Sequence, residues 1–377
     1  MLDLLSGERA AVRHLVGDQA PVWDTAGEIP VGILRELGAA GVLCAEVPKE
    51  YGGLGAASRD SGELTAYVGS LCSSLRSVMT SQGMAAWTMR RLGDREQRAA
   101  FLPGLTEGRL AAVAFSEPDA GSDLSVMDTH LRFTGDTVVV NGRKSWITAA
   151  AYADLVVVFC KAGDDGAVVV VPADAPGVHI EKVPQALGCR AAGHAHVQLD
   201  GVRVPVANVL GGAGLSLPLL VTTALAYGRM SVAWGCVGIL RACLTAVTRH
   251  ARSRVQFGKP IAEHQLIARR IAELFTAEQV ATRACRHASE CWDSGSPDQV
   301  VATVLAKYVS AARAAEGAAS AVQVLASAGA SDGHVVARAH RDAILMETIE
   351  GSSEICQLIL AQHALAGTDP ADQRDAQ

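Results

Sequence analysis

Aromatic residues are scarce in this chain of 377 residues. Phe, Trp and Tyr together make up 4% of the sequence, whereas 49% of it is hydrophobic and alanine is abundant. A core of small aliphatic side chains is typical of helices that pack closely on one another. The length allows a large core and two or three structural units.

The sequence also lacks a concentration of positive charge. Lys and Arg number 33 against 39 Asp and Glu, which gives a formal net charge of −6 at pH 7. Proteins that bind nucleic acid usually carry a basic patch or stripe, so this balance argues against nucleic acid as a partner. A local basic patch for an acidic protein partner is still compatible with these numbers.

The nine cysteines lack the spacing of a zinc site or of a disulfide framework. Their number is odd and no CxxC pair occurs, so we expect no metal and a reducing, cytoplasmic setting. The start MLDLLSGERA has no basic segment before an apolar core, so we expect no signal peptide. The most apolar stretch, residues 215–240, contains Pro218 and Arg229, which favours a buried helix over a membrane span.

Sequence patterns typical of helices and of strands follow one another along the chain in the order α, β, α. Residues 1–110 carry apolar residues at helical spacing, and residues 216–377 return to this pattern as in a helical bundle. Residues 111–215 between them are rich in short Val runs. We therefore predict a mostly α protein with a central β domain. One helix face in the third segment is predicted to hold Ile267, Ile271, Leu274 and Phe275.

Five Val-rich stretches make up the expected β unit: DTVVVNGRKSWIT, ADLVVVFCKA, GAVVVVPAD, GVHIEKVP and HVQLDGVRVP. Helical patterns do not intervene between them, so a barrel or sandwich is favoured over a doubly wound parallel sheet. Turn signals are predicted to separate the strands at Gly135-Asp136, Asn141-Gly142, Asp164-Asp165-Gly166 and Asp200-Gly201.

A carboxylate near the end of the chain lies in a stretch that otherwise reads as buried. The stretch is ETIEGSSEI, and Glu350 directly precedes Gly351 in it. A buried charge is costly unless it is paired or has a function. Glu350 is therefore either a carboxylate that caps or pairs at a helix end, or a catalytic base.

Two stretches in the β segment have both a structural and a functional interpretation. AFSEPDAGSDLS brings Ser116 and Ser122 to the edge of the β unit, either as a polar turn or as a loop that lines a polar ligand. KSWIT has Trp146 and Thr148 at alternate strand positions, so both would face the same side. An indole and a hydroxyl suit a flat heteroaromatic ring, although a buried Trp beside a Thr also occurs in plain core.

The stretch RSRVQFGKPIAEHQ combines Arg254, Gln256, Phe257 and Gly258 before a predicted helix. Arginine can hold a phosphate through two hydrogen bonds, phenylalanine can stack on a ring, and glycine allows close approach of the backbone. The alternative is a helix–helix connection with solvated charges.

In this order the stretches resemble the acyl-CoA dehydrogenase family over nearly the whole chain. The matches are SEPDAGSD, KSWIT, RSRVQFGKPIAEHQ, and AVQVLASAG leading to RDAILMETIEGSSEI. The resemblance implies a helical N-terminal domain (1–110), a middle β domain (111–215) and a C-terminal four-helix bundle (216–377). It further implies FAD between the β domain and the bundle, and a homodimer or homotetramer that shares FAD across a subunit boundary.

The same resemblance implies roles for individual residues. Glu350 matches the catalytic base, and Arg229 and Gly351 would contact the substrate. Some relatives carry the base in a pattern L-x-x-E-R on another helix, but LAYGR here has Gly228 at the Glu position, which favours Glu350. The expected FAD contacts near the ring are Phe115, Ser116, Ser122, Trp146 and Thr148. The expected contacts with the rest of FAD are Arg254, Gln256, Phe257, Gln323, Ser352 and Glu354.

The sequence departs from the family pattern at a few positions. Ala326 and Ser327 replace a usual pair of glycines, which puts one FAD contact in doubt. Ala226 replaces an acid that contacts the pantetheine region in relatives, so an ordinary CoA substrate is less secure.

A closer resemblance rests on SLCSSLRSVMTSQGMAAWT, AYGRMSVAWGCVGILRAC and IEGSSE. These stretches are similar to the acyl-carrier-protein dehydrogenases of polyketide extender-unit pathways, which lead to hydroxymalonyl and methoxymalonyl units. The implied substrate is a small glyceryl-derived acyl group on the phosphopantetheine arm of an acyl carrier protein. The alternatives are a general short- or branched-chain acyl-CoA dehydrogenase, a flavin monooxygenase of the same fold, and a non-catalytic FAD-stabilised scaffold.

Overall fold

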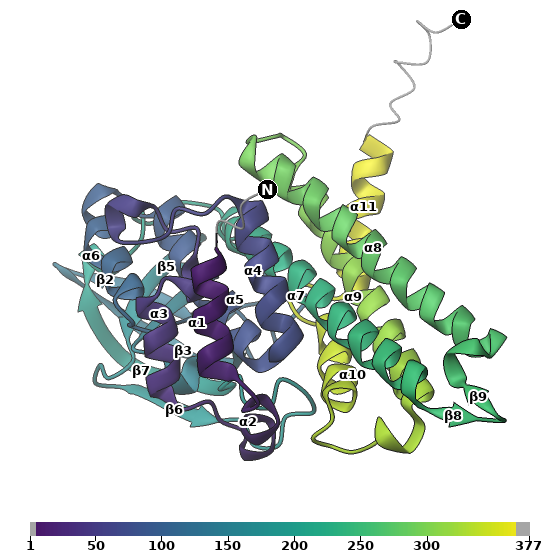
Figure 1. The fold of residues 1–377 in the computed structure, drawn as a ribbon. Helices are drawn as coiled ribbons and strands as arrows, with labels where there is room; N and C mark the ends of the chain where they lie inside the picture. Colours follow the sequence, from purple (N-terminus) through teal and green to yellow (C-terminus); the bar gives the residue numbers. More distant parts are fainter. Residues whose placement is uncertain (1–4, 367–377) are drawn as a thin grey trace, which may run out of the picture.

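The structure is a computed structural model that describes residues 5–366, so the outermost residues of the first and third expected units lie outside it. A helical N-terminal region is followed by a mixed β-sheet and by a long helical C-terminal region (Figure 1). The predicted fold class, mostly α with a central β unit, is confirmed.

The N-terminal region packs short helices around one long buried helix, α5. Cys72 caps α5 by accepting a hydrogen bond from the Leu75 N–H at 3.4 Å, and Asp94 and Gln97 form a capping box at the start of α6. Most residues of α5 are buried, including several polar ones, so other parts of the protein surround this helix along most of its length. The helices are α1 (Ser6–Val16), α2 (Ala20–Ala26), α3 (Val31–Ala39), α4 (Ser58–Leu71), α5 (Ser73–Leu92) and α6 (Arg95–Thr106).

The middle region forms one mixed sheet in which the strand order is β1-β4-β2-β3-β7-β6, with β5 paired to β4. Strand β4 pairs in parallel with β1 and β2, and the other pairs are antiparallel. Two short strands, β1 and β2, were not among the predicted Val-rich stretches. The strands are β1 (Ala111–Ala114), β2 (His130–Thr134), β3 (Thr137–Ile147), β4 (Leu155–Ala162), β5 (Asp165–Pro172), β6 (Val178–Lys182) and β7 (Ala195–Pro205).

Two of the predicted turns are wrong, because Asn141-Gly142 and Asp200-Gly201 lie inside β3 and β7. They face each other across this strand pair, where the register shifts between Val140 and Gly142, and the Gly201 N–H donates to the Asn141 side-chain oxygen at 2.8 Å. Gly142 has φ +150°, and a Cβ there would lie 2.3 Å from the Thr129 hydroxyl. The two glycines thus form part of a β-bulge. Glycine is favoured in β-bulges as it is in turns.

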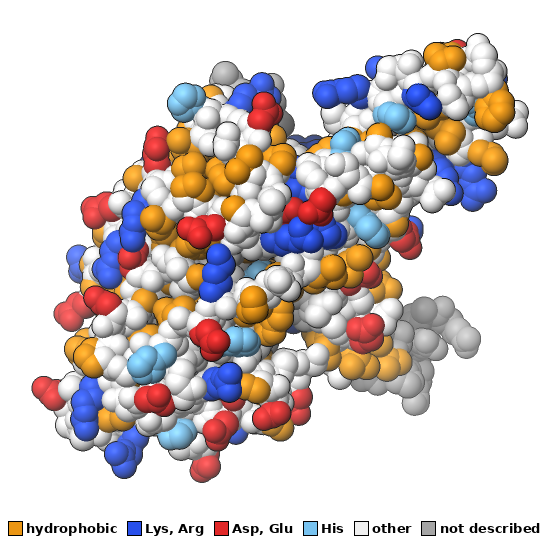
Figure 2. Space-filling model, turned by 90° about the horizontal axis from the view of Figure 1, so that it is seen from below, with side chains coloured by type: hydrophobic (Ala, Val, Ile, Leu, Met, Phe, Trp, Pro, Cys, Tyr) orange, Lys and Arg blue, Asp and Glu red, His pale blue; other side chains and the backbone are white. Residues whose placement is uncertain are grey.

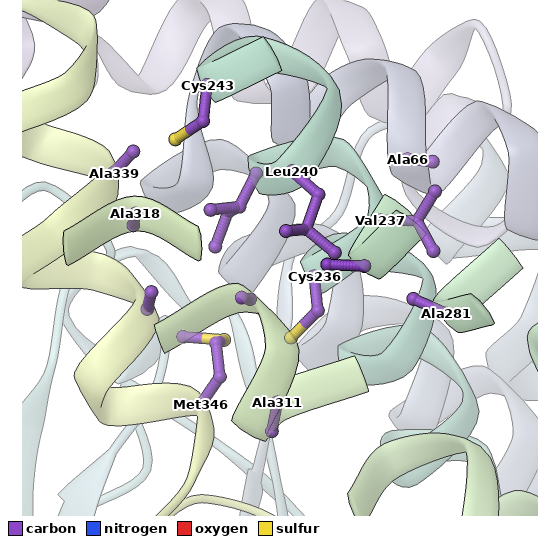
Figure 3. Close-up of a cluster of buried hydrophobic side chains, with 14 of the residues drawn as sticks. Ala66, Cys236, Val237, Leu240, Cys243, Ala281, Ala311, Ala318, Ala339 and Met346 are labelled. Carbon is purple, nitrogen blue, oxygen red and sulfur yellow. The ribbon is translucent and has the colours of Figure 1, made fainter. Parts of the chain in front are cut away.

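The C-terminal region is a bundle of long helices that pack through small side chains. Figure 3 shows Ala281, Ala311 and Ala318 of α8 and α9 meeting Cys236 and Leu240 of α7. Small residues allow the helix axes to come close, in agreement with the aromatic-poor composition. The elements are α7 (Leu217–Ser253), β8 (Val255–Gln256), β9 (Lys259–Pro260), α8 (Gln265–Asp293), α9 (Gln299–Leu325), α10 (Val335–Met346) and α11 (Ser353–Ala366).

The long apolar helix α7 is a core helix. It is long and apolar enough to cross a membrane, but 72% of its most apolar window is buried inside the protein. The predicted buried helix over residues 215–240 is therefore confirmed. The residues of the predicted face, Ile267, Ile271, Leu274 and Phe275, all lie in α8 at helical spacing. Leu274 is 3% exposed and Phe275 is 53% exposed, so the face runs from the core to the surface.

Candidate active site

Glu350 lies in the turn between α10 and α11, in a backbone conformation that is rare for residues other than glycine. Its φ is +55°, and Gly351 follows with φ +90°. Two buried cations hold this turn: the Arg229 Nε donates to the Glu350 carbonyl at 3.1 Å, and the Lys307 Nζ donates to the carbonyls of Glu347 and Gly351. A residue other than glycine in this left-handed backbone conformation costs roughly 1–3 kcal/mol of stability. It persists only where several surrounding contacts hold the backbone in place.

The Glu350 side chain has an enclosed oxygen without a partner among the described residues. Its Oε2 makes no hydrogen bond and lies against Gly228, where a Cβ would come within 2.3 Å of this oxygen. Burial raises the pKa of Glu350 above its ordinary value, although the charges of Arg229, Lys307 and Arg76 act in the opposite direction. The carboxylate does not cap a helix here. A buried carboxylate oxygen without a hydrogen-bond partner is suited to accept a proton from a substrate.

A second part of the site lies at the edge of the sheet, where two segments are tied together. The Ser145 N–H donates to the Ser116 carbonyl at 2.8 Å, which joins the end of β3 to the loop after β1. The Lys144 Nζ donates to the Phe115 carbonyl at 3.0 Å and forms an ion pair with Glu117 at 2.8 Å. This buried pair fixes the path of the Phe115–Ser116 backbone, and Ser122 lies exposed on the loop that follows.

The Glu117–Lys144 pair is buried yet well satisfied. Burial alone would raise the pKa of Glu117, but hydrogen bonds from the Asp128 N–H and from Lys144 hold this pKa below its ordinary value. The Thr129 N–H donates to the same carboxylate at 3.0 Å. A pair with this many partners can act as a rigid support for a binding loop.

Trp146 and Thr148 do not alternate on a regular strand, so this detail of the prediction is wrong. The β3–β7 register shifts between Lys144 and Ile147, Trp146 has φ +58°, and β3 ends at Ile147. Both residues nevertheless meet at His194: the Trp146 ring lies 6.0 Å from the imidazole, and the Thr148 hydroxyl lies 3.3 Å from Nδ1. Trp146 is 55% exposed. A solvent-exposed indole beside a hydroxyl could contact one face or edge of a flat ring, such as the flavin of FAD.

The remaining expected FAD contacts lie elsewhere in the chain. Arg254, Gln256 and Phe257 lie on and beside the β8–β9 hairpin, at the end of the bundle far from the sheet (Figure 1). Phe257 is 95% exposed with φ +51°. One chain therefore does not bring this group to Trp146, and the contact of the hairpin with the FAD of a neighbouring subunit stays a prediction.

The last three expected contacts lie at helix ends. Gln323 is exposed near the end of α9, close to Ala326, and Glu354 is exposed in the first turn of α11. Ser352 lies two residues after Glu350. Its hydroxyl accepts a hydrogen bond from the Ile355 N–H at 3.4 Å. Ala326, which stands where relatives have glycine, has φ +51° and ψ −130°, a conformation that glycine adopts most easily.

Sequence reasoning missed the residues that support the site. Lys144, Glu117 and Arg76 lie within the quoted stretches KSWIT, SEPDAGSD and SLCSSLRSVMTSQGMAAWT but are not singled out there, and His194 lies outside all of them. A lysine that points inward from a Val-rich strand needs a buried partner, and this was the available signal for Lys144. The sequence held no comparable signal for His194, because its neighbours Trp146 and Thr148 come from the end of β3 and the residue after it.

Comparison with known proteins agrees with this geometry. The chain matches the N-terminal domain of acyl-CoA dehydrogenases over residues 5–109, the middle domain over 112–202 and the C-terminal domain over 219–365. It is 33% identical to the probable acyl-CoA dehydrogenase YngJ of Bacillus subtilis (strain 168), over 96% of this chain and 99% of that protein. The chain therefore belongs to the acyl-CoA dehydrogenase family, whose members are FAD-dependent oxidoreductases that act on acyl thioesters.

Solved structures of similar proteins give more detail. The chain is 64% identical to FkbI, for biosynthesis of the methoxymalonyl extender unit of the FK520 polyketide immunosuppressant. That alignment covers 95% of this chain and 99% of the FkbI chain, with a TM-score of 0.92. A glutaryl-CoA dehydrogenase from Mycobacterium smegmatis in complex with FADH2 is 26% identical, with a TM-score of 0.90 over 98% of this chain and 95% of that chain.

Proposed function

We propose that this protein oxidises a small glyceryl-derived acyl thioester on an acyl carrier protein toward the hydroxymalonyl state, in the supply of polyketide extender units in the cytoplasm. The observation that carries the proposal is the buried Oε2 of Glu350, which has no hydrogen-bond partner among the described residues, in a chain that is 64% identical to FkbI. The role of FkbI in the biosynthesis of a methoxymalonyl extender unit supports the substrate class.

Two groups of residues would hold FAD. Phe115, Ser116, Ser122, Trp146 and Thr148 would lie against the flavin ring. Arg254, Gln256, Phe257 and Gln323 of a second copy would reach the pyrophosphate and adenosine end, with Ser352 and Glu354 also near the nucleotide. Bound there, FAD supplies the acceptor for the hydride that the substrate loses.

The chain itself supplies the proton chemistry. Glu350 takes a proton from carbon 2 of the acyl group or from a hydroxyl oxygen of it, and its raised pKa brings the base closer to neutral pH. The backbone N–H of Glu350 is the family's donor to the thioester oxygen, where negative charge develops. Arg229 keeps that N–H in place through the Glu350 carbonyl, and Gly351 allows the turn.

The exposed apolar surface of the bundle supports a homodimer as the smallest working unit. Leu266 is 76% exposed and Phe275 is 53% exposed on α8, beside a groove that Leu244 and Ile271 also line. On the face that Figure 2 shows, Lys and Arg side chains are interspersed with Asp and Glu. A second copy that covers α8 would also bring its hairpin residue Phe257 to the FAD of this chain.

The test is anaerobic bleaching of the protein's flavin by one glyceryl-type acyl group, presented on a carrier protein and on CoA. We expect rapid bleaching with the carrier-bound form and at least tenfold slower bleaching with the CoA form. Equal or faster bleaching with CoA would instead assign the chain to the general acyl-CoA dehydrogenases. If neither form bleaches the flavin, the aldehyde-level acyl group is the next substrate, and failure there would contradict the proposed substrate class.

A further inference from the structure

His194 lies next to both side chains that would contact the flavin ring from the end of β3. The Thr148 hydroxyl lies 3.3 Å from the His194 Nδ1, and the centroids of the Trp146 and His194 rings are 6.0 Å apart. The family resemblance gave no role to this histidine. Its contacts raise the question of what the imidazole does for the two expected flavin contacts.

The backbone on both sides of the contact between Thr148 and His194 is held in place. The Ser81 hydroxyl donates to the Thr148 carbonyl at 3.1 Å, which ties this residue to α5. Gly193, directly before His194, has φ +66°, and a Cβ there would lie 2.4 Å from the Tyr152 ring. Only glycine fits at that position, so the chain reaches His194 by a fixed path. The hydroxyl and the imidazole are therefore brought together by the backbone.

The second nitrogen of the imidazole is buried and unused. The Nε2 of His194 makes no hydrogen bond to any of residues 5–366. Burial lowers the pKa of His194 to about 4, and the charge of Arg76 acts in the same direction, so the ring is neutral near pH 7. A neutral imidazole carries one proton, so one of its nitrogens donates a hydrogen bond and the other accepts one.

The charge of Arg76 favours the tautomer of His194 with the proton on Nδ1. A guanidinium attracts a nitrogen lone pair and repels an N–H group, and Nε2 is the nitrogen without a partner among the described residues. In this tautomer Nδ1 donates to the Thr148 oxygen, and the proton of the Thr148 hydroxyl stays free for another acceptor. In the other tautomer Thr148 would spend its proton on Nδ1 and offer only lone pairs.

We propose that His194 is a positioning residue for FAD, whose Nδ1–H donates to the Thr148 oxygen and thereby directs the Thr148 hydroxyl proton toward an acceptor atom of the oxidised flavin ring. Hydrogen bonds to the ring nitrogens are one way in which a protein tunes a flavin. The neutral imidazole is a weak base, so His194 does not replace Glu350 in taking the substrate proton. This inference goes beyond the proposed function, because it concerns how FAD is held and does not depend on the acyl group.

The test measures the Kd for FAD of the full-length protein after the cofactor has been removed, by titration of flavin fluorescence. Thr148→Val removes the hydroxyl, and His194→Gln places an amide near Nε2 but none at Nδ1. Each variant should weaken FAD binding roughly 2- to 10-fold, the range expected for one hydrogen bond. Because His194 acts through Thr148, the double variant should bind FAD within twofold of Thr148→Val.

His194→Asn is the matched control, because the amide nitrogen of asparagine takes the place of Nδ1 and can donate to Thr148. We expect its FAD affinity to lie within twofold of the wild type. A loss in His194→Asn as large as the loss in His194→Gln would overturn the proposal, since it would show that the ring and not its Nδ1–H is needed.

Other results would also overturn the proposal. An unchanged FAD affinity in His194→Gln or in Thr148→Val would remove that residue from flavin binding. A double variant whose loss is the product of the two single losses would show that His194 acts independently of Thr148. If His194→Gln does not fold, NMR of the FAD-loaded wild type with isotope-labelled histidine nitrogens decides: we expect the His194 proton on Nδ1, and a proton on Nε2 would contradict the proposal.

Discussion

Replacing Gly228 by alanine tests whether the Glu350 carboxylate must lie where the structure places it. The new Cβ would lie 2.3 Å from Oε2 and 2.7 Å from the carboxyl carbon, whereas ordinary contact begins at 3.4 Å. The carboxylate must therefore move by about 1 Å, and a misplacement of that size can cost on the order of 100-fold in rate. We predict that Gly228→Ala slows flavin reduction roughly 10- to 100-fold, while FAD content stays unchanged.

The assay is anaerobic stopped-flow reduction of the bound flavin at saturating substrate. Gly32→Ala is the matched control, because Gly32 lies in helix α3 and a Cβ there would meet nothing within 4 Å. Alanine gains about 0.5–1 kcal/mol of helix propensity over glycine in the interior of a helix such as α7, and no more than this in the first turn of α3, where Gly32 lies. A slower flavin reduction in Gly228→Ala alone therefore reports on Glu350 rather than on helix stability. A Gly228→Ala rate constant within twofold of the control would refute the reasoning.

Three further predictions concern stability and cofactor retention. Ala326→Gly should raise the free energy of unfolding by about 1 kcal/mol, because φ +51° and ψ −130° strain an alanine; a lower thermal midpoint would contradict this. The pKa of His194 is lowered from 6.5 to about 4, so the unfolded chain binds a proton that the folded one does not, and stability is lost as pH falls from 6.5 toward 4. Denaturation midpoints across that range should fall less steeply in His194→Gln than in the wild type. Phe257→Ala should weaken FAD retention about 3- to 10-fold through lost stacking, without lowering the stability of the single chain, as FAD content after gel filtration would report; unchanged retention would speak against the shared site.

Much of the fold could be predicted from the sequence, because its signals are local. Helical periodicity and Val-rich runs depend on neighbouring residues, and they placed the long core helix α7 and the five main strands correctly. The family resemblance likewise rested on contiguous motifs, and it implied the role of catalytic base for Glu350, which the apolar surroundings in the sequence had already singled out.

The errors arose where one residue pattern serves two geometries. Asn141-Gly142 has the composition of a hairpin turn, but it lies within β3 opposite a bulge in which β7 has one extra residue, at Asp200-Gly201. The Trp146–Thr148 alternation failed because a left-handed residue interrupts β3. Such choices depend on the partner strand, which a single stretch of sequence does not reveal.

The most direct test of Glu350 as the base is the rate constant for anaerobic flavin reduction by the carrier-bound substrate in Glu350→Gln. Glutamine keeps the shape of the side chain but cannot accept the proton, so we predict a fall of about 10²- to 10⁴-fold with FAD still bound. In the wild type, the rate should also rise with pH through the raised pKa of Glu350, because only the ionised carboxylate is a base. A Glu350→Gln rate constant within threefold of the wild type would contradict the assignment.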